Sequence, residues 1–339
     1  MWYYYNVRKD LNGGILMKLK KILLSILLIL IIATAVFFML KGGNIKKSDA
    51  SKIKIVASNF ASYDFLRAII GDNKNIELTF LIGPGKDAHS YDPSAQDLVT
   101  IQNADLFVYI GGEMENWAEK VLETTNIENT KTICISNFVD TVKEKEIDGA
   151  EKEHEEEHNE KGAFDEHIWT SPVNAIKMIS ALEKEVEKLD ETKKDMYKQN
   201  SEKYISQIKE VDSKIQNIVD KKVRDRLVFG DKMPMQYFID YYKLNVTAAF
   251  NGCSTEIDPS ASTIAYLEDR VKKEKIPVVL YIELNPGQVA KTIANEAGNG
   301  CEAMQIQTLH NISLDDFNKG ETWVSLMTRN IEVLKKALQ

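Results

Sequence analysis

Residues 192–219 read TKKDMYKQNSEKYISQIKEVDSKIQNIV, and this stretch decides the fold. Neither glycine nor proline interrupts it. Its apolar residues recur every four or three positions, which places them on one stripe of a single long helix: Tyr204, Ile208, Val211, Ile215 and Ile218. The stripe is narrow and the other faces are charged, as expected of a helix that lies across a surface or joins two lobes.

Short apolar segments alternate with amphipathic ones on both sides of this helix. Strands are predicted before it at 54–58, 76–82, 105–110 and 132–136, and after it at 226–229, 246–250, 277–282 and 304–308. Such alternation is typical of a mostly parallel sheet covered by helices. We therefore predict an α/β protein of two similar lobes, with the N-terminal lobe at 52–190, the linking helix at 191–220 and the C-terminal lobe at 221–339.

Composition excludes several classes of protein. The chain has 339 residues and a formal net charge of −8, a length that fits about two domains. An acidic balance argues against nucleic-acid binding, because that function usually needs a basic face. Three cysteines without a CxxC motif exclude a disulfide scaffold, although Cys253 and Cys301 could form one disulfide. We expect a monomer.

The N-terminus carries a membrane-directing segment. Residues 22–40 are apolar except for Ser25 and Thr34 and follow three lysines; that length nearly spans a bilayer, and the lysines place the N-terminus in the cytoplasm. Residues 17–51 are therefore a signal anchor or a cleaved signal peptide with its linker, and the rest lies on the extracytoplasmic face of the cell membrane. No cysteine lies near the end of the apolar run, so we do not expect a lipoprotein. Residues 1–16 are a start-site artefact or a short cytoplasmic tail.

Residues 144–166 form an acidic block. It holds 11 acidic residues and 3 lysines, so its net charge of −8 equals that of the whole chain. Such a block is usually a solvated, mobile loop. His154 and His158 lie four residues apart within it, and they either gather metal weakly beside a site or are incidental.

Three of the five histidines lie where a predicted strand gives way to a helix or loop. His89 follows the strand at 76–82, His167 precedes a helix that opens at Pro172, and His310 follows the last strand. Ligands of open α/β sheets bind beyond the carboxyl ends of the strands, so these side chains could converge in one crevice. Imidazole is a common zinc ligand, and a carboxylate often completes such a site.

The order of motifs over residues 52–339 resembles the metal-binding solute-binding proteins of bacterial ABC importers, the zinc and manganese group often called ZnuA/TroA-like. The resemblance rests on short motifs: Pro84-Gly85 with His89, Tyr91, Pro93 and Asp97; Ala104-Asp105-Leu106; Gly111-Gly112; Glu115-Asn116-Trp117; His167-Ile168-Trp169 with Pro172; residues 252–260; and Glu283. It implies two α/β lobes joined by a rigid helix, with the metal between them.

The resemblance also implies the metal ligands. The first two match His89 and His167. The third is normally His or Glu, but only Asp231 is available here, and the fourth, normally acidic, falls near His310. We predict that Asp231 supplies the carboxylate and His310 the third imidazole, a set that suits zinc better than manganese; Glu283 is the alternative. Thr170-Ser171 replaces the family's Leu-Asp, which removes a carboxylate that could support a ligand from behind.

These observations predict an extracytoplasmic, membrane-tethered protein that captures zinc, or alternatively manganese, and delivers it to an ABC permease with its ATPase. It would catalyse nothing. One rival is a membrane-anchored zinc hydrolase with Glu283 as general base, although no HExxH motif supports it. The other is a cell-adhesion protein in which the metal is structural.

Overall fold

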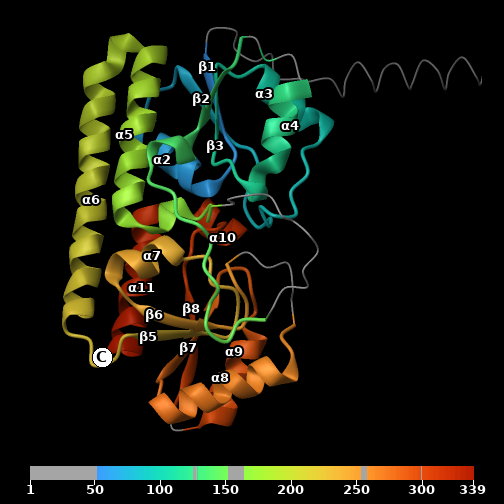
Figure 1. Ribbon diagram of the computed structural model, residues 1–339. Coiled ribbons are helices and arrows are strands. Elements are labelled where there is room, and N and C mark those ends of the chain that lie inside the picture. The colour runs from blue at the N-terminus through green and yellow to red at the C-terminus, as the bar shows by residue number, and fades with distance from the viewer. Residues whose placement is uncertain (1–51, 125–126, 128, 152–163, 253–257, 299) are drawn as a thin grey trace, which may run out of the picture. The chain divides into compact units, whose positions relative to one another are not determined.

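Four short strands form the N-terminal sheet of the computed structural model, which describes residues 52–124, 127, 129–151, 164–252, 258–298 and 300–339. The strands are all parallel, in the order β2-β1-β3-β4: β1 (Ile53–Ala57), β2 (Ile76–Phe80), β3 (Leu106–Tyr109) and β4 (Lys131–Cys134). Their helices are α2 (Phe60–Ile70), α3 (Ala95–Gln102), α4 (Asn116–Thr124) and α5 (Pro172–Leu189), with α3 and α4 on one side of the sheet and α2 and α5 on the other (Figure 1).

The C-terminal sheet repeats this arrangement, in the order β6-β5-β7-β8 and again all parallel. Its strands are β5 (Arg226–Phe229), β6 (Asn245–Ala248), β7 (Val278–Ile282) and β8 (Glu302–Ile306). Its helices are α7 (Gln236–Tyr242), α8 (Ala261–Glu274), α9 (Gln288–Ala297), α10 (Leu314–Asn318) and α11 (Trp323–Leu338). The predicted fold class of two mostly parallel α/β lobes is confirmed, while the predicted boundaries between lobes stay predictions.

One helix of 27 residues, α6 (Lys194–Asp220), runs beside both sheets (Figure 1). The predicted stripe is buried, and Tyr197, Ser201 and Val219 extend it. The helix packs on α5 and α2 in the first half of the protein and on α11 in the second. One uninterrupted helix therefore packs against elements of both lobes.

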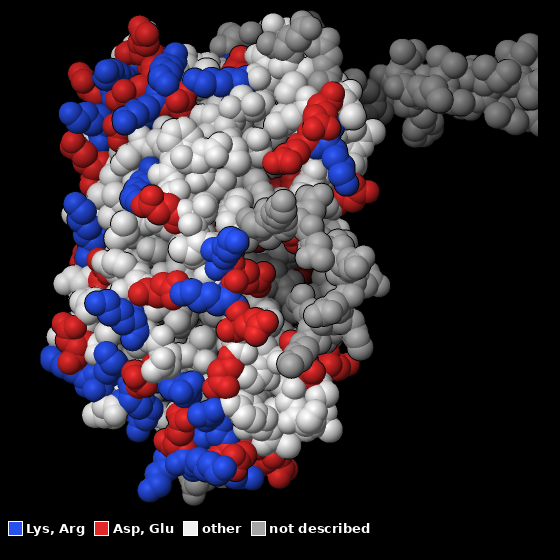
Figure 2. Space-filling model, viewed as in Figure 1, with Lys and Arg blue, Asp and Glu red and all other residues white. Residues whose placement is uncertain are grey.

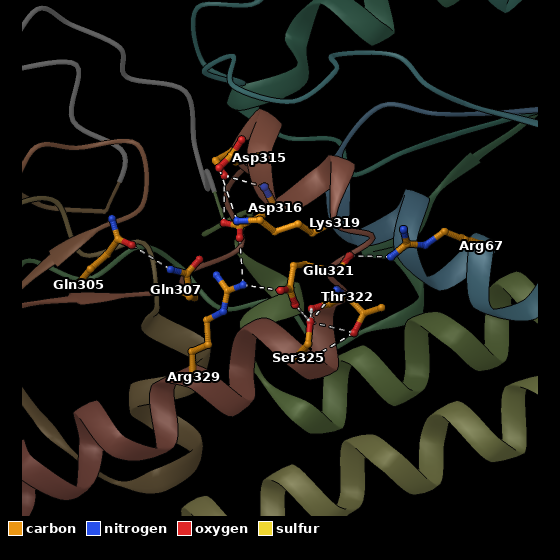
Figure 3. A network of polar contacts seen from close by, with 11 residues as sticks. Arg67, Gln305, Gln307, Asp315, Asp316, Lys319, Glu321, Thr322, Ser325 and Arg329 are labelled. Carbon is orange, nitrogen blue, oxygen red and sulfur yellow. Dashed lines mark hydrogen bonds and ion pairs between the residues drawn. The ribbon is translucent and has the colours of Figure 1, made fainter.

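Polar contacts fix the start of α11 against α2. The guanidinium of Arg67, on α2, donates to the backbone carbonyl of Glu321 at 2.7 Å. The Glu321 carboxylate in turn accepts a bond from Arg329, 2.6 Å away (Figure 3). The buried Asp64 also accepts the backbone N–H of Trp323 at 2.7 Å. The C-terminal helix is therefore anchored in the N-terminal lobe.

The last strand ends earlier than the sequence predicts, at Ile306. The buried side chain of Asn330, on α11, accepts the N–H of Gln307 at 2.8 Å and donates to its carbonyl at 2.7 Å. Both backbone groups of Gln307 are thus removed from the strand ladder. The chain then turns through Leu309, whose φ of 57° is left-handed. This turn brings His310 back toward the N-terminal lobe.

Part of the acidic block is docked on the C-terminal lobe, which the prediction of a solvated loop did not foresee. Asp148 bridges to Thr247 beside β6, and its carboxylate accepts bonds from Tyr266 at 2.6 Å and Arg270 at 3.0 Å. Tyr266 and Arg270 thus hold a segment whose composition alone suggests that it is solvated. Elsewhere on the face that Figure 2 shows, acidic and basic side chains are interspersed. This agrees with the sequence, in which positive and negative charges balance outside the acidic block.

Residues Ile53–Gln339 form one unit of the chain. The predicted start-site segment, the signal anchor over 17–51, His154, His158 and Cys253 lie outside the described residues. Cys301 carries a free thiol. In the part of the chain that the structure describes, no helix has the length and apolar character needed to cross a membrane.

Candidate metal centre

The structure brings His89, His167 and His310 together. One ring nitrogen of each lies within 4.8 Å of the others. The His89 and His310 rings stack with centroids 4.9 Å apart, and the His167 centroid lies 5.5 Å from that of His310. Tetrahedral zinc at about 2.1 Å from each nitrogen would need nitrogens about 3.4 Å apart. Small side-chain rotations would close that difference.

Each histidine follows or precedes an element for a local reason. His89 lies between β2 and α3, and its backbone N–H donates to Asp87 at 2.8 Å. His167 precedes the short 3-10 helix η3 (Ile168–Thr170), where Pro172 then opens α5. His310 follows β8, and its N–H donates to Glu283 at 2.8 Å. Two strand ends and one helix start thus supply the cluster.

The Nε2 atoms of His89 and His310 are buried and have no hydrogen-bond partner within the described residues. Buried polar atoms nearly always have partners, so an unpaired one needs an explanation. A metal ion between the imidazoles would provide one, because each Nε2 would then hold a coordinate bond. The donor set thus fits a transition metal of zinc type.

The electrostatics keep two of the three imidazoles neutral. Burial, and then the charge of nearby His167, lower the pKa of His89 to about 4. Burial, together with the charges of His167 and His89, holds the pKa of His310 well below its ordinary value. Neutral imidazole is the form that binds a metal. Protons therefore bind weakly to these two imidazoles near neutral pH.

His167 is supported by Asp165, a residue that the sequence analysis missed. Burial disfavours a charged His167, but the Asp165 carboxylate, together with the charges of Glu166 and Glu144, outweighs burial and raises the pKa of His167. The Asp165 carboxylate lies 2.9 Å from the ring Nδ1, so Nε2 is the atom directed to a metal. The family resemblance implies a supporting carboxylate shortly after Trp169, where this chain has none. Asp165, two residues before His167, supplies one instead. The spacing Asp-x-His was the signal that could have revealed it.

The predicted carboxylate ligand, Asp231, does not join the three-histidine group. Its side chain lines the same cavity as His89 and His310, but its two oxygens accept the backbone N–H groups of Lys232 at 2.8 Å and Ile282 at 3.1 Å. The role of Asp231 as a ligand stays a prediction, and it would require the carboxylate to turn away from these bonds.

Glu283 positions the His310 loop. Its carboxylate accepts bonds from the backbone and hydroxyl of Thr308, each at 2.8 Å, and from the backbone of His310. The side chain is 7% exposed. In this arrangement Glu283 holds the backbone of His310 in place, and its oxygens are already engaged.

The segments that carry the histidines are bonded to one another across the two sheets. The indole of Trp169 donates to the carbonyl of Thr308 at 3.0 Å. The amide nitrogen of Asn311 donates to the carbonyls of Gly83 and Lys86. The backbone N–H of Gly85 donates to the carbonyl of Ile312 at 2.8 Å. These hydrogen bonds hold the histidine-bearing segments of the two lobes together.

This fold and this site define a two-lobed metal-binding solute-binding protein of the ZnuA/TroA-like group. The chain belongs to the family described as zinc-uptake complex component A, periplasmic, whose model matches residues 55–337. Members of that family are components of a metal-uptake complex.

Relatives of this chain have names that agree with this family assignment. The chain is 31% identical over 312 residues to the zinc-binding lipoprotein AdcA of Streptococcus pneumoniae, covering 91% of this chain but only 60% of that protein. It is 29% identical to the high-affinity zinc uptake system protein ZnuA of Bacillus subtilis, covering 88% and 91% of the two chains. The expectation that this chain is not a lipoprotein conflicts with the name of the pneumococcal relative, and we withdraw it. That expectation had rested on the missing cysteine alone.

Solved structures show the same fold. The Zn(II)-bound ZnuA-like domain of S. pneumoniae AdcA matches with a TM-score of 0.69 and 27% identity, covering 85% of this chain and 99% of that one. A Mn-bound periplasmic metal-binding protein from Candidatus Liberibacter asiaticus matches with a TM-score of 0.68 at 20% identity, which supports the fold alone.

Proposed function

We propose that the protein captures zinc on the extracytoplasmic face of the membrane and delivers it to an ABC permease with its ATPase. The observation that carries the proposal is the convergence of three imidazoles from both lobes. Two of them, His89 and His310, have buried Nε2 atoms that lack hydrogen-bond partners in the described residues. The names of the pneumococcal and B. subtilis relatives support zinc as the cargo.

The donor set favours zinc over manganese. Nitrogen ligands suit zinc, whereas manganese prefers oxygen ligands, and the affinity order of divalent metals also places zinc above manganese. The ligands that we propose are His89, His167 and His310. Asp231 would be the fourth if its carboxylate turned toward the metal. Capture and release need no bond to be broken in a substrate.

A hydrolytic function finds no support at this site. The general base that the sequence offers for it is Glu283, and its oxygens hold Thr308 and the backbone of His310. A base must be free to accept a proton from a reacting group. We therefore propose binding without catalysis.

Zinc binding by the purified full-length protein tests the proposal. Metal should be removed with a chelator, and zinc then titrated in competition with a fluorescent zinc indicator. We expect one tight site, and His310→Ala should weaken it at least about tenfold. The variant His154→Ala, His158→Ala is the matched control and should keep the tight site unchanged. A parent protein that binds no zinc tightly, or a His310→Ala variant that binds it like the parent, would contradict the proposal.

A further inference from the structure

Lys232 lines the cavity beside the histidine cluster. The cavity has a volume of about 340 Å³, and its wall includes His89, His310, Asp231 and Lys232. Lys232 follows Asp231 directly after β5, and its charge contributes to lowering the pKa of both His89 and His310, behind burial and the neighbouring histidines. No ion pair joins the Lys232 ammonium to an acidic residue of the described ranges. A positively charged side chain without an acidic partner among the described residues therefore lines the same cavity as two of the proposed metal ligands.

The acidic residues of the same wall are engaged elsewhere. Asp231 accepts two backbone N–H groups, Glu283 accepts the loop around Thr308, and Asp87 accepts the N–H of His89. These contacts hold the three carboxylates in place around the cavity. None of them belongs to the cluster of ligand atoms that the described residues form.

Three imidazoles leave one coordination position of a tetrahedral zinc ion to be filled. In zinc sites with three protein ligands, water or a small exogenous molecule takes that position. Three neutral imidazoles also leave the double positive charge of the ion uncompensated, so an anionic fourth donor is favoured. A carboxylate is the donor that would complete the usual set of nitrogens and one oxygen.

The cavity has room for such a molecule. A water molecule occupies about 30 Å³ of liquid, and cavities of about 300 Å³ and above are the size of small-ligand pockets. The space next to His89 and His310 thus exceeds what a bare ion with one water would fill. An anion that bridged the metal and Lys232 would make one coordinate bond and one charge-assisted hydrogen bond.

Building on the proposed zinc function, we propose that the metal is carried together with a small carboxylate anion. One oxygen of the anion occupies the fourth coordination position, and the other accepts a hydrogen bond from the Lys232 ammonium. The cargo is therefore a metal–carboxylate pair and not the bare ion. Lys232 is the residue that selects the anion, and Asp231 remains bonded to the backbone of Lys232 and Ile282.

Cobalt reports the fourth ligand directly, because the visible absorption of Co²⁺ changes with its donor set. The full-length protein should be loaded with one equivalent of Co²⁺ and titrated with sodium acetate at constant ionic strength in a non-coordinating salt. We expect a saturable spectral change. In Lys232→Gln the acetate concentration at half-saturation should rise at least about tenfold, as loss of a hydrogen bond to a charged group implies. Lys232→Arg, and the exposed Lys319→Gln as a matched charge control, should respond like the parent.

Three results would overturn the inference. The first is a parent protein that binds Co²⁺ but shows no saturable response to acetate. The second is a Lys232→Gln variant that responds at the same acetate concentration as the parent. The third is an Asp231→Asn variant whose spectrum before acetate already differs from that of the parent, since Asp231 would then be the fourth ligand. If the parent binds neither cobalt nor zinc, the proposed function itself has failed, so the two failures can be told apart.

Discussion

The side-chain amide of Asn311 donates to the backbone carbonyl of Gly83 at 3.2 Å, and this bond joins the loop that carries His310 to the loop that carries His89. The same amide nitrogen also donates to the carbonyl of Lys86, and Asn311 is 2% exposed. Two loops from different sheets therefore share one buried donor. Together with the bond from the Gly85 N–H to the Ile312 carbonyl, this donor holds the two histidine-bearing loops against each other.

We predict that Asn311→Asp weakens zinc binding about tenfold or more and speeds zinc release, because a carboxylate would face two carbonyl oxygens without a hydrogen to donate. Affinity should be measured by indicator competition and release by stopped flow after adding excess chelator. Asn103→Asp is the matched control, since Asn103 is an exposed amide that donates to the carbonyl of Val99 at 2.7 Å. Equal release rates in the parent and Asn311→Asp would rule out this positioning role.

Asp165→Asn should lower zinc affinity by about 10- to 100-fold, the range typical of a lost partner behind a metal-binding histidine. The amide can still accept from Nδ1 of His167, but the negative charge that raises the pKa of His167 is gone. The pKa of His167 in the metal-free protein should therefore fall, which NMR can follow. Asp140→Asn, at an exposed residue paired with Lys177, should change neither quantity. An unchanged pKa of His167 would show that Asp165 is not its electrostatic partner.

The sequence was sufficient for the parts of the molecule that depend on periodicity. The stripe from Tyr204 to Ile218 lies on one helix, α6, because every fourth or third residue of a helix shares a face. His89 and His310 meet because parallel strands present their carboxyl ends to the same crevice. Both features follow from spacing along the chain.

The supports of the site could not be predicted, because they depend on loop conformation. Asn311 reaches Gly83 only because the chain turns through a left-handed Leu309 after β8 has ended at Ile306. Asp231 is the acidic residue nearest in the sequence to the expected third ligand. Its carboxylate nevertheless accepts the backbone N–H groups of Lys232 and Ile282. A pattern of residue types does not indicate which of the polar groups around it a carboxylate such as that of Asp231 will bind.

Asp148 should contribute to stability although it lies in the acidic block. Asp148→Ala removes bonds to Tyr266 and Arg270, and the side chain is partly exposed, so we expect a loss of roughly 1 kcal/mol in the free energy of unfolding. Urea unfolding followed by circular dichroism would measure it. Asp140→Ala, at an exposed ion pair, should cause no measurable change. If both variants unfold like the parent, residues around Asp148 are not held by these contacts.

Glu115 should make stability fall as pH rises toward neutrality. Burial raises the pKa of Glu115 to about 7 from 4.5, although the backbone N–H groups of Ile110 and Gly111 oppose the shift by donating to its carboxylate. Between these two values the folded protein retains a proton that the unfolded chain has released. The unfolded state then binds fewer protons, so the free energy of unfolding decreases with pH in this window and levels off above about 7.

Glu115→Gln should remove this dependence, because the amide has a similar shape and does not ionise. The variant should match the parent most closely near pH 5 and exceed it in stability by roughly 2 to 3 kcal/mol near pH 7.5, as a pKa shift of this size implies. Urea unfolding of the metal-free protein at both pH values gives the comparison. Glu113→Gln removes the same charge from an exposed neighbour and should leave the pH dependence of the parent intact. If the stability difference between Glu115→Gln and the parent is the same at both pH values, Glu115 does not titrate in this window and its burial has not raised its pKa.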